Sequence, residues 1–545
     1  MSSILSFLRS RCTAPVAAML SMVVVLLFFG GILAVTHNPL SLDDGLRHFV
    51  MAKEQLRLGI GAVTWSRYFF LTYFIHHAVD PWFLANLSYV PFTFFTSSVA
   101  GIKAATFAFL CVLAFSFSLF LRRFPVTPFF TALIIFLFFF GSDTFGFRLM
   151  LGRPFVLVSA LMLFVLHALI TRRWLLLAVL LALSTLFSHL FIFPFGIAVI
   201  GSLWWLFICR NPRSVCASVF ATMGGMTTGI ILHPQSREYV LWMKNIFFVV
   251  PFSKELDLGG EIYSGLGFAD AGVYLLLISC ILLIFLLAVR QELANALHRR
   301  PEIILLGVLA LLFFAAYLLW VRAIDLFWPM GVILLLSLVS ATDGAMQDAK
   351  RFLFSKQFPL GIRAMHVVIV LFVITSAHHL WLFVGNDDRR SVASFSAINA
   401  VPAGSTVFNA DWEYFPVLFF LRSDLLYARG MDPTHDELPV RSLIAKLHEA
   451  KFLPKETLFS REWFTELWSR VDMKQLGIRR MGEKDVDADA WLMELRSIAQ
   501  PQYLALYRGA HPRLIQSLTT SSGATLFSES RAMIIFSLHP STNTR

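Results

Sequence analysis

Charged residues are scarce in this chain. Asp, Glu, Lys and Arg make up only 14% of its 545 residues, 57% are hydrophobic, and the mean hydropathy is +0.71. Soluble globular domains contain about 25% charged residues, so the composition excludes that class and predicts a membrane protein. The sequence also lacks internal repeats and low-complexity tracts, which leaves the order of apolar and polar segments as the guide to the fold.

Cysteine is scarce as well. The five cysteines all lie in or beside apolar segments, so the sequence supports neither a disulfide framework nor a zinc site. The formal net charge is +11, but the basic residues form short clusters between apolar runs, without a basic groove of interleaved aromatic residues. These clusters predict contact with anionic lipid headgroups and no nucleic-acid partner.

The apolar segments that are present predict about eleven membrane-spanning helices. The first, Ala14 to Thr36, is long enough to cross a hydrocarbon core of about 30 Å. Arg9 and Arg11 form a basic region before it, but the run is too long for a typical signal peptide and no clear small-residue cleavage site follows, so an uncleaved anchor with a cytoplasmic N-terminus is expected. The other spans are expected near residues 104–121, 126–140, 154–170, 175–188, 190–208, 215–232, 272–289, 303–321, 326–341 and 364–384. An odd number of spans places the C-terminus on the outer side.

Basic residues lie in the predicted cytoplasmic loops at every crossing, as the positive-inside rule requires. The clusters are Arg122-Arg123, Arg172-Arg173, Arg210 with Arg213, Arg299-Arg300, and Lys350-Arg351 with Lys356 and Arg363. The run 175–208, interrupted by Ser188-His189 and Pro194, is either one long helix or two short ones. A single helix would invert the orientation of every later span, and the agreement of the basic residues with the positive-inside rule would become much worse.

The sequence predicts two domains. Residues 1–384 are expected to form a transmembrane domain whose outer loops, 37–103 and 233–271, mix apolar, aromatic and charged residues, as helices lying along the outer leaflet do. From Gly385 the composition is that of a soluble protein. Short β-type runs at 405–408, 503–507 and 532–538 alternate with helix-like stretches such as 439–450 and 487–499. Residues 385–545 are therefore predicted to be a mixed α/β extracytoplasmic domain.

Two carboxylates, Asp43 and Asp44, follow the first span on the outer side. Ionisable residues near the membrane that the positive-inside rule does not explain are functional candidates. If the following segment is helical, Asp44 and His48 lie four residues apart on one face, where the imidazole would orient the carboxylate. The alternative is that Asp43 or Asp44 caps an interfacial helix.

Arginines on the predicted outer side form a second set of candidates. Arg148 and Arg153 lie between two spans, where their alternative role is to reach lipid headgroups. Arg322 is expected to be a buried cation at the outer end of a late span, either in an anion site or paired with Asp325. Five further polar residues complete the outer-face set: Arg47, His189, Asp143, His233 and Arg237.

Together, a carboxylate and several arginines at the outer leaflet suit one kind of chemistry. The carboxylate would act as general base for an acceptor hydroxyl or amine, and the guanidinium groups would stabilise a departing lipid phosphate. This is glycosyl transfer from a polyprenyl-phosphate sugar.

The chain resembles the GT-C superfamily of integral membrane glycosyltransferases, particularly the branch of protein O-mannosyltransferases and aminoarabinose lipid A transferases. The shared features are the acidic motif in the first outer loop, the number of spans, the arginine at the outer end of a late span, and the C-terminal domain. The segment from Asn409 to Pro416 is similar to a pattern in uncharacterised bacterial GT-C-like proteins. The resemblance implies that Asp44 or Asp43 is the catalytic base, with Asp44 favoured by its spacing to His48, and that Arg322 binds lipid phosphate.

Two departures from the superfamily narrow the expected reaction. Asp-Asp stands where many members have Asp-Glu, and the chain has no Trp-Trp-Asp sequence of the oligosaccharyltransferase type. Transfer of a preassembled oligosaccharide with a bound metal is thereby disfavoured, and a metal-independent inverting reaction is expected. Asp43 and Asp143 leave a divalent cation as an alternative.

The expected setting is the bacterial cytoplasmic (inner) membrane. The partners would be membrane lipids, a polyprenyl-phosphate sugar donor, and an acceptor lipid, glycan or protein. Three rival interpretations stay open: a transporter or flippase for a lipid-linked or anionic substrate, a polysaccharide polymerase or ligase, and a membrane-anchored binding protein.

Overall fold

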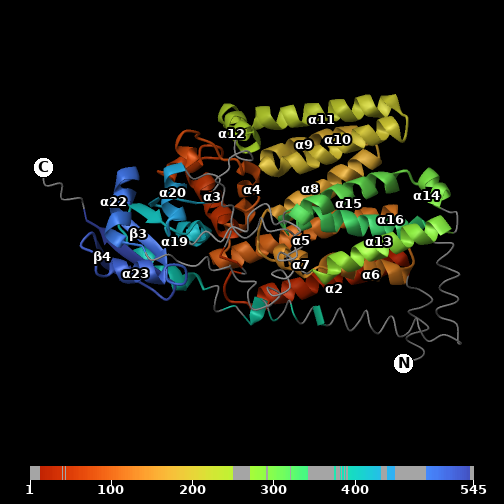
Figure 1. Cartoon of the computed structure of the whole chain (residues 1–545). Coiled ribbons are helices and arrows are strands. Elements are labelled where there is room, and N and C mark those ends of the chain that lie inside the picture. The colour runs from red at the N-terminus through yellow and green to blue at the C-terminus, as the bar shows by residue number, and fades with distance from the viewer. Residues whose placement is uncertain are drawn as a thin grey trace, which may run out of the picture. The chain divides into compact units, whose positions relative to one another are not determined.

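The computed structural model (Figure 1) describes residues 13–39, 41–42, 44–248, 270–289, 293–319, 321–341, 374–375, 378, 381, 383–385, 387, 391–430, 438–447 and 486–539. The chain divides into two compact units. The helical unit comprises residues 1–40, 99–232 and 264–389, and the sheet unit comprises residues 41–98, 233–263 and 390–545. The two outer loops, predicted as parts of the transmembrane domain, thus fold mainly with the C-terminal region.

Apolar helices build the helical unit. They are α2 (Ala14–Val35), α5 (Ser98–Arg123), α6 (Pro128–Phe140), α7 (Asp143–Leu149), α8 (Phe155–Ile170), α9 (Trp174–Phe187), η4 (His189–Phe191), α10 (Ile192–Phe207), α11 (Pro212–Leu232), α13 (Ala271–Val289), α14 (Leu293–Arg299), α15 (Glu302–Leu319), η8 (Val321–Ala323) and α16 (Ile324–Ala341). Each predicted span up to 326–341 coincides with one of them. The last, 364–384, lies mostly outside the described residues.

Length and hydropathy qualify fewer of these helices as spans than the sequence predicted. Five described helices are individually long and apolar enough to cross a membrane, and the number rises to seven if each of two bent pairs is one span. The bends are 74° between α6 and α7 and 101° between α14 and α15. The difference arises because α8 and α9 have only 16 and 14 residues, fewer than the roughly 20 that a span needs, and because only Gly272–Phe285 of α13 qualifies as an apolar helix. The fourth missing span, 364–384, lies mostly outside the described residues.

The helix ends form two groups, of which the first carries the predicted cytoplasmic arginines. Arg300 Nη1 donates to Ser340 Oγ at 2.8 Å, and Ser340 Oγ donates to the Pro125 carbonyl at 2.9 Å. Arg123, at the end of α5, forms an ion pair of 3.1 Å with Glu302. These contacts bring the ends of α5, α14 and α16 together.

The second group includes the end of the first span. Lys103, near the start of α5, donates to the Thr36 carbonyl, and the Asp387 carboxylate accepts from the backbone N–H groups of His37 and Asn38 at 2.6 and 3.0 Å. Because α5 runs from this group to the first, Asp387 and the end of α16 belong to opposite ends of the unit.

The apolar run 175–208 forms two helices, α9 and α10, rather than one. Ser188 interrupts the run with an extended backbone (φ −172°, ψ 171°), and its Oγ accepts from the Leu190 N–H at 3.2 Å. α9 packs closely on α11 because glycines of α11 face it: a Cβ at Gly225 or Gly229 would lie 2.4 or 2.6 Å from a backbone carbonyl of α9. Small residues allow such close approach between apolar helices.

The sheet unit contains a five-stranded mixed sheet of order β2-β1-β3-β5-β4, which confirms the predicted α/β class of the C-terminal region. The strands are β1 (Thr406–Asn409), β2 (Leu426–Tyr427), β3 (Tyr503–Tyr507), β4 (Ala524–Glu529) and β5 (Met533–Leu538). β2, β1 and β3 are parallel, whereas β5 is antiparallel to β3 and β4. The helices of the region are η10 (Val392–Ala400), η11 (Trp412–Tyr414), α19 (Phe415–Leu421), α20 (Leu438–Ala445), α22 (Ala488–Ile498) and α23 (Pro512–Leu518). Side chains of α20, α22 and α23 share one apolar core with the sheet.

The outer loops supply further elements of the sheet unit: α3 (Asp44–Leu58), η1 (Trp65–Arg67), η2 (Tyr73–Ile75), α4 (Phe83–Leu87), η3 (Val90–Phe92) and α12 (Ser236–Phe248). The first loop joins the sheet region by backbone pairing at β2, where the Phe70 N–H donates to the Tyr427 carbonyl at 3.1 Å and the Tyr427 N–H donates to the Tyr68 carbonyl at 2.8 Å. The Trp65 ring also lies 5.7 Å from that of Phe419 in α19. Aromatic packing and backbone pairing thus explain why this loop folds with the C-terminal region.

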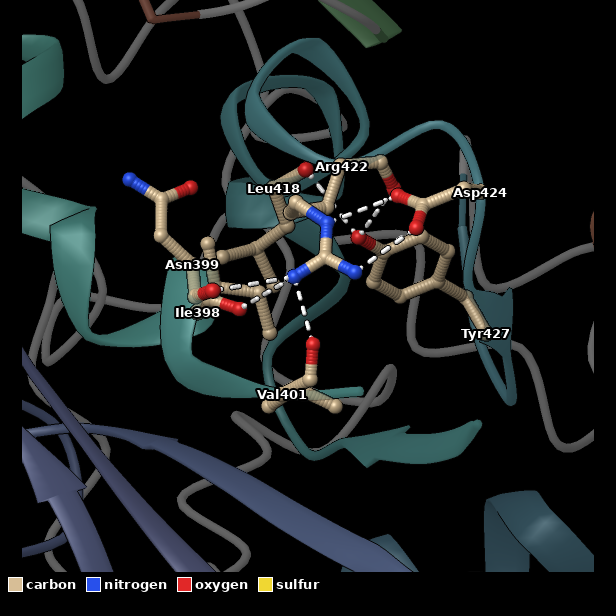
Figure 2. A network of polar contacts seen from close by, with 7 residues as sticks. All are labelled: Ile398, Asn399, Val401, Leu418, Arg422, Asp424 and Tyr427. Carbon is tan, nitrogen blue, oxygen red and sulfur yellow. Dashed lines mark hydrogen bonds and ion pairs between the residues drawn. The ribbon is translucent and has the colours of Figure 1, made fainter. Parts of the chain in front are cut away.

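Arg422 ties the end of α19 to its surroundings in the sheet unit (Figure 2). Its Nε and Nη2 donate to the two Asp424 carboxylate oxygens, each at 2.7 Å. Its Nη1 donates to backbone carbonyls at the end of η10, those of Ile398, Asn399 and Val401. Tyr427 Oη donates to the Leu418 and Arg422 carbonyls at 3.0 and 2.9 Å. The guanidinium fork thus satisfies the carbonyls of an irregular turn and fixes the entry to β2.

Candidate functional site

Asp44 lies in the first turn of α3, where a helix N-terminus stabilises negative charge. Arg47 Nε lies 3.0 Å from Asp44 Oδ1, an ion pair without hydrogen-bond alignment. The Arg47 side chain is only 5% exposed, whereas that of Asp44 is 28% exposed. The Arg47 guanidinium stacks over the Trp82 ring at 4.7 Å, and its Nη1 has no hydrogen-bond partner among the described residues. A solvent-accessible carboxylate is thus held by a buried cation.

His48 does not have the partner that the spacing predicted. Its Nδ1 lies 2.5 Å from Asn86 Oδ1, and its ring stacks on Tyr89 with centroids 6.2 Å apart. Burial lowers the pKa of His48 to about 3, and the positive charge of Arg47 acts in the same direction. His48 is therefore neutral at physiological pH, and the ion pair that Asp44 forms is with Arg47 instead.

Asp80 and Asn86 extend this arrangement, and sequence reasoning missed both. Asn86 Nδ2 donates to both Asp80 carboxylate oxygens at 2.9 and 2.7 Å. Trp65 Nε1, Gln55 Nε2 and the Trp82 N–H donate to the same carboxylate at 3.0, 3.2 and 3.2 Å. Asp80 is fully buried, and burial raises its pKa to about 6 against the opposing effect of these hydrogen bonds. A signal was available, because Asp80 is an outer-side carboxylate between apolar and aromatic residues.

The second outer loop holds Asp80 by its backbone. The Asp80 carbonyl accepts from His233 Nε2 at 3.2 Å, and the Asp80 N–H donates to Gln235 Oε1 at 3.3 Å. The His233 ring stacks on Tyr239 of α12 with centroids 4.2 Å apart, and burial lowers the pKa of His233 to about 4. The two outer loops therefore meet at Asp80 inside the sheet unit.

The helical unit brings three predicted residues together around a small cavity. Arg148, at the end of α7, donates from Nε to Asp325 Oδ2 of α16 at 2.6 Å, and both side chains are nearly buried. Arg153 lies close enough to act electrostatically on the same carboxylate. The cavity is lined by Phe145, Arg148, Leu149, Arg153, Phe155, Val156, Ser159 and Asp325. Two cations and one carboxylate leave a net positive charge on a partly aromatic surface.

Arg322 does not occupy the buried position that the sequence predicted. It is exposed in η8, the short turn that separates α15 from α16. A turn between two apolar helices presents its polar side chain to the surface, so the expectation of a buried cation is wrong. Arg322 still lies close enough to Asp325 for its charge to act on that carboxylate.

The remaining candidates do not line the cavity of the described helical unit. Asp143 is exposed at the start of α7, whose N-cap is Ser142. His189 lies at the break between α9 and α10. Asp43 falls outside the described residues. Within the described part of the chain, no three His, Cys, Asp or Glu residues form a group that could hold a metal ion.

The predicted residues therefore form two sets. Asp44, Arg47 and His48 come together in the sheet unit, with Asp80 and Asn86 behind them. Arg148, Arg153 and Asp325 come together in the helical unit. The first set offers an accessible base, and the second a cationic surface beside aromatic side chains.

Solved structures with the same fold are known, although no protein-family model and no curated protein sequence matches the chain. ArnT from Cupriavidus metallidurans, in the apo state, is 12% identical with a TM-score of 0.50, over 95% of this chain and 97% of ArnT. The apo oligosaccharyltransferase of Archaeoglobus fulgidus is 9% identical with a TM-score of 0.53, over 97% of this chain and 75% of its own.

A second structure of the Archaeoglobus fulgidus oligosaccharyltransferase, tethered to an acceptor peptide containing the NVT sequon, gives a TM-score of 0.52 at 11% identity, over 96% of this chain and 74% of its own. These similarities extend over nearly the whole chain. They confirm the predicted fold, which the chain shares with ArnT and the oligosaccharyltransferase.

Proposed function

We propose that this chain is a membrane glycosyltransferase that moves a sugar from a polyprenyl-phosphate donor to an acceptor on the outer face of the bacterial cytoplasmic membrane. The observation that carries the proposal is the Asp44–Arg47 pair: an accessible carboxylate in the first turn of α3, beside a cation that is almost fully buried. The GT-C fold supports the same reaction class.

Asp44 is assigned the role of general base. A base must be ionised and must reach the acceptor, and the 28% exposure of Asp44 meets the second condition. Arg47 favours the ionised carboxylate by its charge. The Nη1 of Arg47 has unused donor capacity that an anionic or hydroxyl group of a substrate would satisfy.

Arg153 and Arg148 are assigned to the donor phosphate, with Arg322 at the surface nearby. Guanidinium groups bind phosphate oxygens through paired, charge-assisted hydrogen bonds. Arg148 pairs with Asp325 at 2.6 Å and Arg153 lines the same cavity, so both guanidinium groups are assigned to the phosphate. The aromatic side chains Phe145 and Phe155 form part of the same cavity wall.

The proposed step is a single displacement with inversion. The acceptor hydroxyl or amine loses its proton to the Asp44 carboxylate, and its electron pair forms the bond to the anomeric carbon from the face opposite the phosphate. The bond between the anomeric carbon and the phosphate oxygen breaks, and its electron pair leaves with the polyprenyl phosphate. Arginine side chains stabilise the charge that develops on that phosphate.

The lipid that co-purifies with the protein tests the donor half of the proposal. Lipids are extracted from the full-length protein and from Arg153→Gln, and the polyprenyl-phosphate sugars are measured by mass spectrometry. We expect such a lipid with the parent and about a tenfold reduction with Arg153→Gln, since a buried charge-assisted contact contributes about 1.5–3 kcal/mol.

Arg299→Gln is the matched control, because it removes an exposed arginine at the end of α14, in the group of helix ends that carries the predicted cytoplasmic arginines. It should retain the lipid. Arg148 is unsuitable for this comparison, since its removal would leave the buried Asp325 without its ion pair and destabilise the fold. Extraction of phospholipids alone, equally from all three proteins, would contradict the proposed donor.

A further inference from the structure

A continuous chain of hydrogen bonds connects a buried carboxylate with the helix that carries the proposed base. Asp80 binds Asn86 Nδ2, and Asn86 Oδ1 binds His48 Nδ1. Asp80, Asn86 and His48 are each at most 1% exposed. His48 lies one helical turn beyond Asp44 in α3, so the chain ends one turn away from the proposed base.

The direction of each hydrogen bond follows from the chemistry of the groups. An ionised carboxylate has no proton to donate, so Asn86 must present its NH₂ group to Asp80. The amide oxygen of Asn86 then faces His48 and can only accept. His48 must therefore carry its proton on Nδ1, which leaves the lone pair on Nε2.

Three further donors keep Asp80 in the role of acceptor. Trp65, Gln55 and the Trp82 N–H surround the carboxylate, and the neighbouring His233 and Gln235 hold its backbone. With this number of donors, both carboxylate oxygens are occupied as acceptors. The amide of Asn86 consequently cannot turn over without facing the carboxylate with its own oxygen.

We propose that Asp80 is a positioning residue for the reaction: through Asn86 it selects the Nδ1-protonated tautomer of His48 and thereby fixes the first turns of α3 that carry Asp44 and Arg47. The proposal rests on the proposed function of Asp44. His48 also contacts the Trp82 ring edge-on at 6.5 Å, and Arg47 stacks over the same ring. A change in the His48 hydrogen bond would therefore alter the positions of both Asp44 and Arg47.

The tautomer is measured directly by ¹⁵N NMR on the full-length protein labelled at its 15 histidines. The His48 signals are identified as those missing from the spectra of both His48→Asn and His48→Gln. We expect a protonated Nδ1 and an unprotonated Nε2. A proton on Nε2, or an imidazolium, would overturn the assignment without any reference to activity.

The two His48 variants also distinguish positioning from bulk stability. The amide nitrogen of Asn replaces Nδ1 of histidine, whereas that of Gln replaces Nε2. His48→Asn should therefore keep kcat close to the parent value, while His48→Gln should lower kcat by about tenfold, the effect of losing one buried hydrogen bond. The assay uses the lipid donor identified by mass spectrometry.

Tyr73→Phe is the matched control in the first outer loop, because it removes the 2.6 Å hydrogen bond between Tyr73 Oη and His77 Nε2 and leaves Asp80, Asn86 and His48 in place. It should keep kcat, whereas Asn86→Leu should lower kcat with little change in KM. Equal losses in His48→Asn and His48→Gln, or an equal loss in Tyr73→Phe, would overturn the positioning role. If no variant and no parent protein transfers sugar, the proposed function fails, and the NMR result still decides the tautomer.

Discussion

At the scale of single residues, the sequence predicted which side chains matter better than it predicted their partners. The sequence indicated Asp44, Arg47 and His48 because ionisable residues near a membrane are energetically costly to leave unpaired and are therefore candidates for function. Helical spacing suggested that the His48 imidazole would orient the Asp44 carboxylate, but in the structure His48 is hydrogen-bonded to Asn86. The partner came from a residue 38 positions away, and a contact of that kind depends on how the loop folds back, which periodicity does not specify.

Asp80 is a residue that the sequence did not single out, because its contacts depend on the fold. Its importance comes from four donors that reach it from separate parts of the first outer loop. Two of those donors, Gln55 and Trp65, lie 25 and 15 positions away, and the sequence around Asp80 does not encode them. The predicted burial of Arg322 failed for a related reason, since the turn that exposes it is a feature of how α15 and α16 connect.

Buried neutral histidines should make the protein sensitive to acid. The pKa values of His48 and His233, about 3 and 4, lie below the ordinary value of 6.5, so the unfolded chain binds more protons and stability falls as the pH drops below 6.5. Asp80 acts oppositely between its values of about 6 and 3.8, because its raised pKa makes the folded state bind the extra proton. At about pH 5, each histidine lowers the free energy of unfolding by about 2 kcal/mol, and Asp80 raises it by about 1 kcal/mol.

Thermal unfolding of the full-length protein checks this balance. The midpoint should be lower at about pH 5 than at about pH 7.5, and His233→Gln should reduce the difference. His539→Gln, at an exposed position near the end of the sheet, is the control and should leave it unchanged. Equal midpoints at both pH values for the parent protein would contradict the balance.

At the scale of elements, apolar runs located the helices well. Every predicted span up to 326–341 became a helix, and the run 175–208 resolved into two because Ser188 adopts an extended backbone. Strands were predicted less completely: β1, β3 and β5 matched β-type runs, whereas β2 and β4 were missed. β2 has only two residues, and β4 exposes most of its side chains, so neither has the alternation that marks a half-buried strand.

The contact between α9 and α11 gives a prediction at this scale. A Cβ at Gly225 would lie 2.4 Å from the Ala178 carbonyl oxygen, a backbone atom that cannot move alone. Gly225→Ala should therefore separate the two helices and lower the thermal midpoint of the protein. Gly224→Ala is the matched control, because nothing lies within 4 Å of its added Cβ; it should keep or raise the midpoint, since alanine is the better helix former by about 1 kcal/mol. The same loss in both variants would show that the close approach does not matter.

At the scale of the whole molecule, the predicted class was correct, and the compact units of the structure follow a different division from the predicted domains. Composition and hydropathy were sufficient for a polytopic membrane protein with an α/β region. The domain boundary was placed where the composition changes, yet the outer loops fold with the C-terminal region. Composition could not reveal this, because the loops join the sheet unit through backbone pairing at Tyr427 and aromatic packing at Phe419.

Fold similarity at 9–12% identity also has a physical explanation. Apolar helices tolerate extensive exchange among hydrophobic residues as long as volume and pattern persist. The polar groups at the loops are more demanding, so a shared fold leaves the substrates open. The assignment of a sugar donor and an acceptor therefore depends on the chemistry of Asp44 and Arg153, and on experiment.

The most direct test of the account is the rate of sugar transfer by full-length Asp44→Asn. The lipid donor is the one identified by mass spectrometry, and the parent protein and Glu494→Gln, which removes an exposed ion-paired carboxylate in α22, serve as references. The account predicts a loss of at least about 100-fold with Asp44→Asn, the contribution of a general base, with normal folding and unchanged lipid co-purification. Transfer by Asp44→Asn at the parent rate would contradict it.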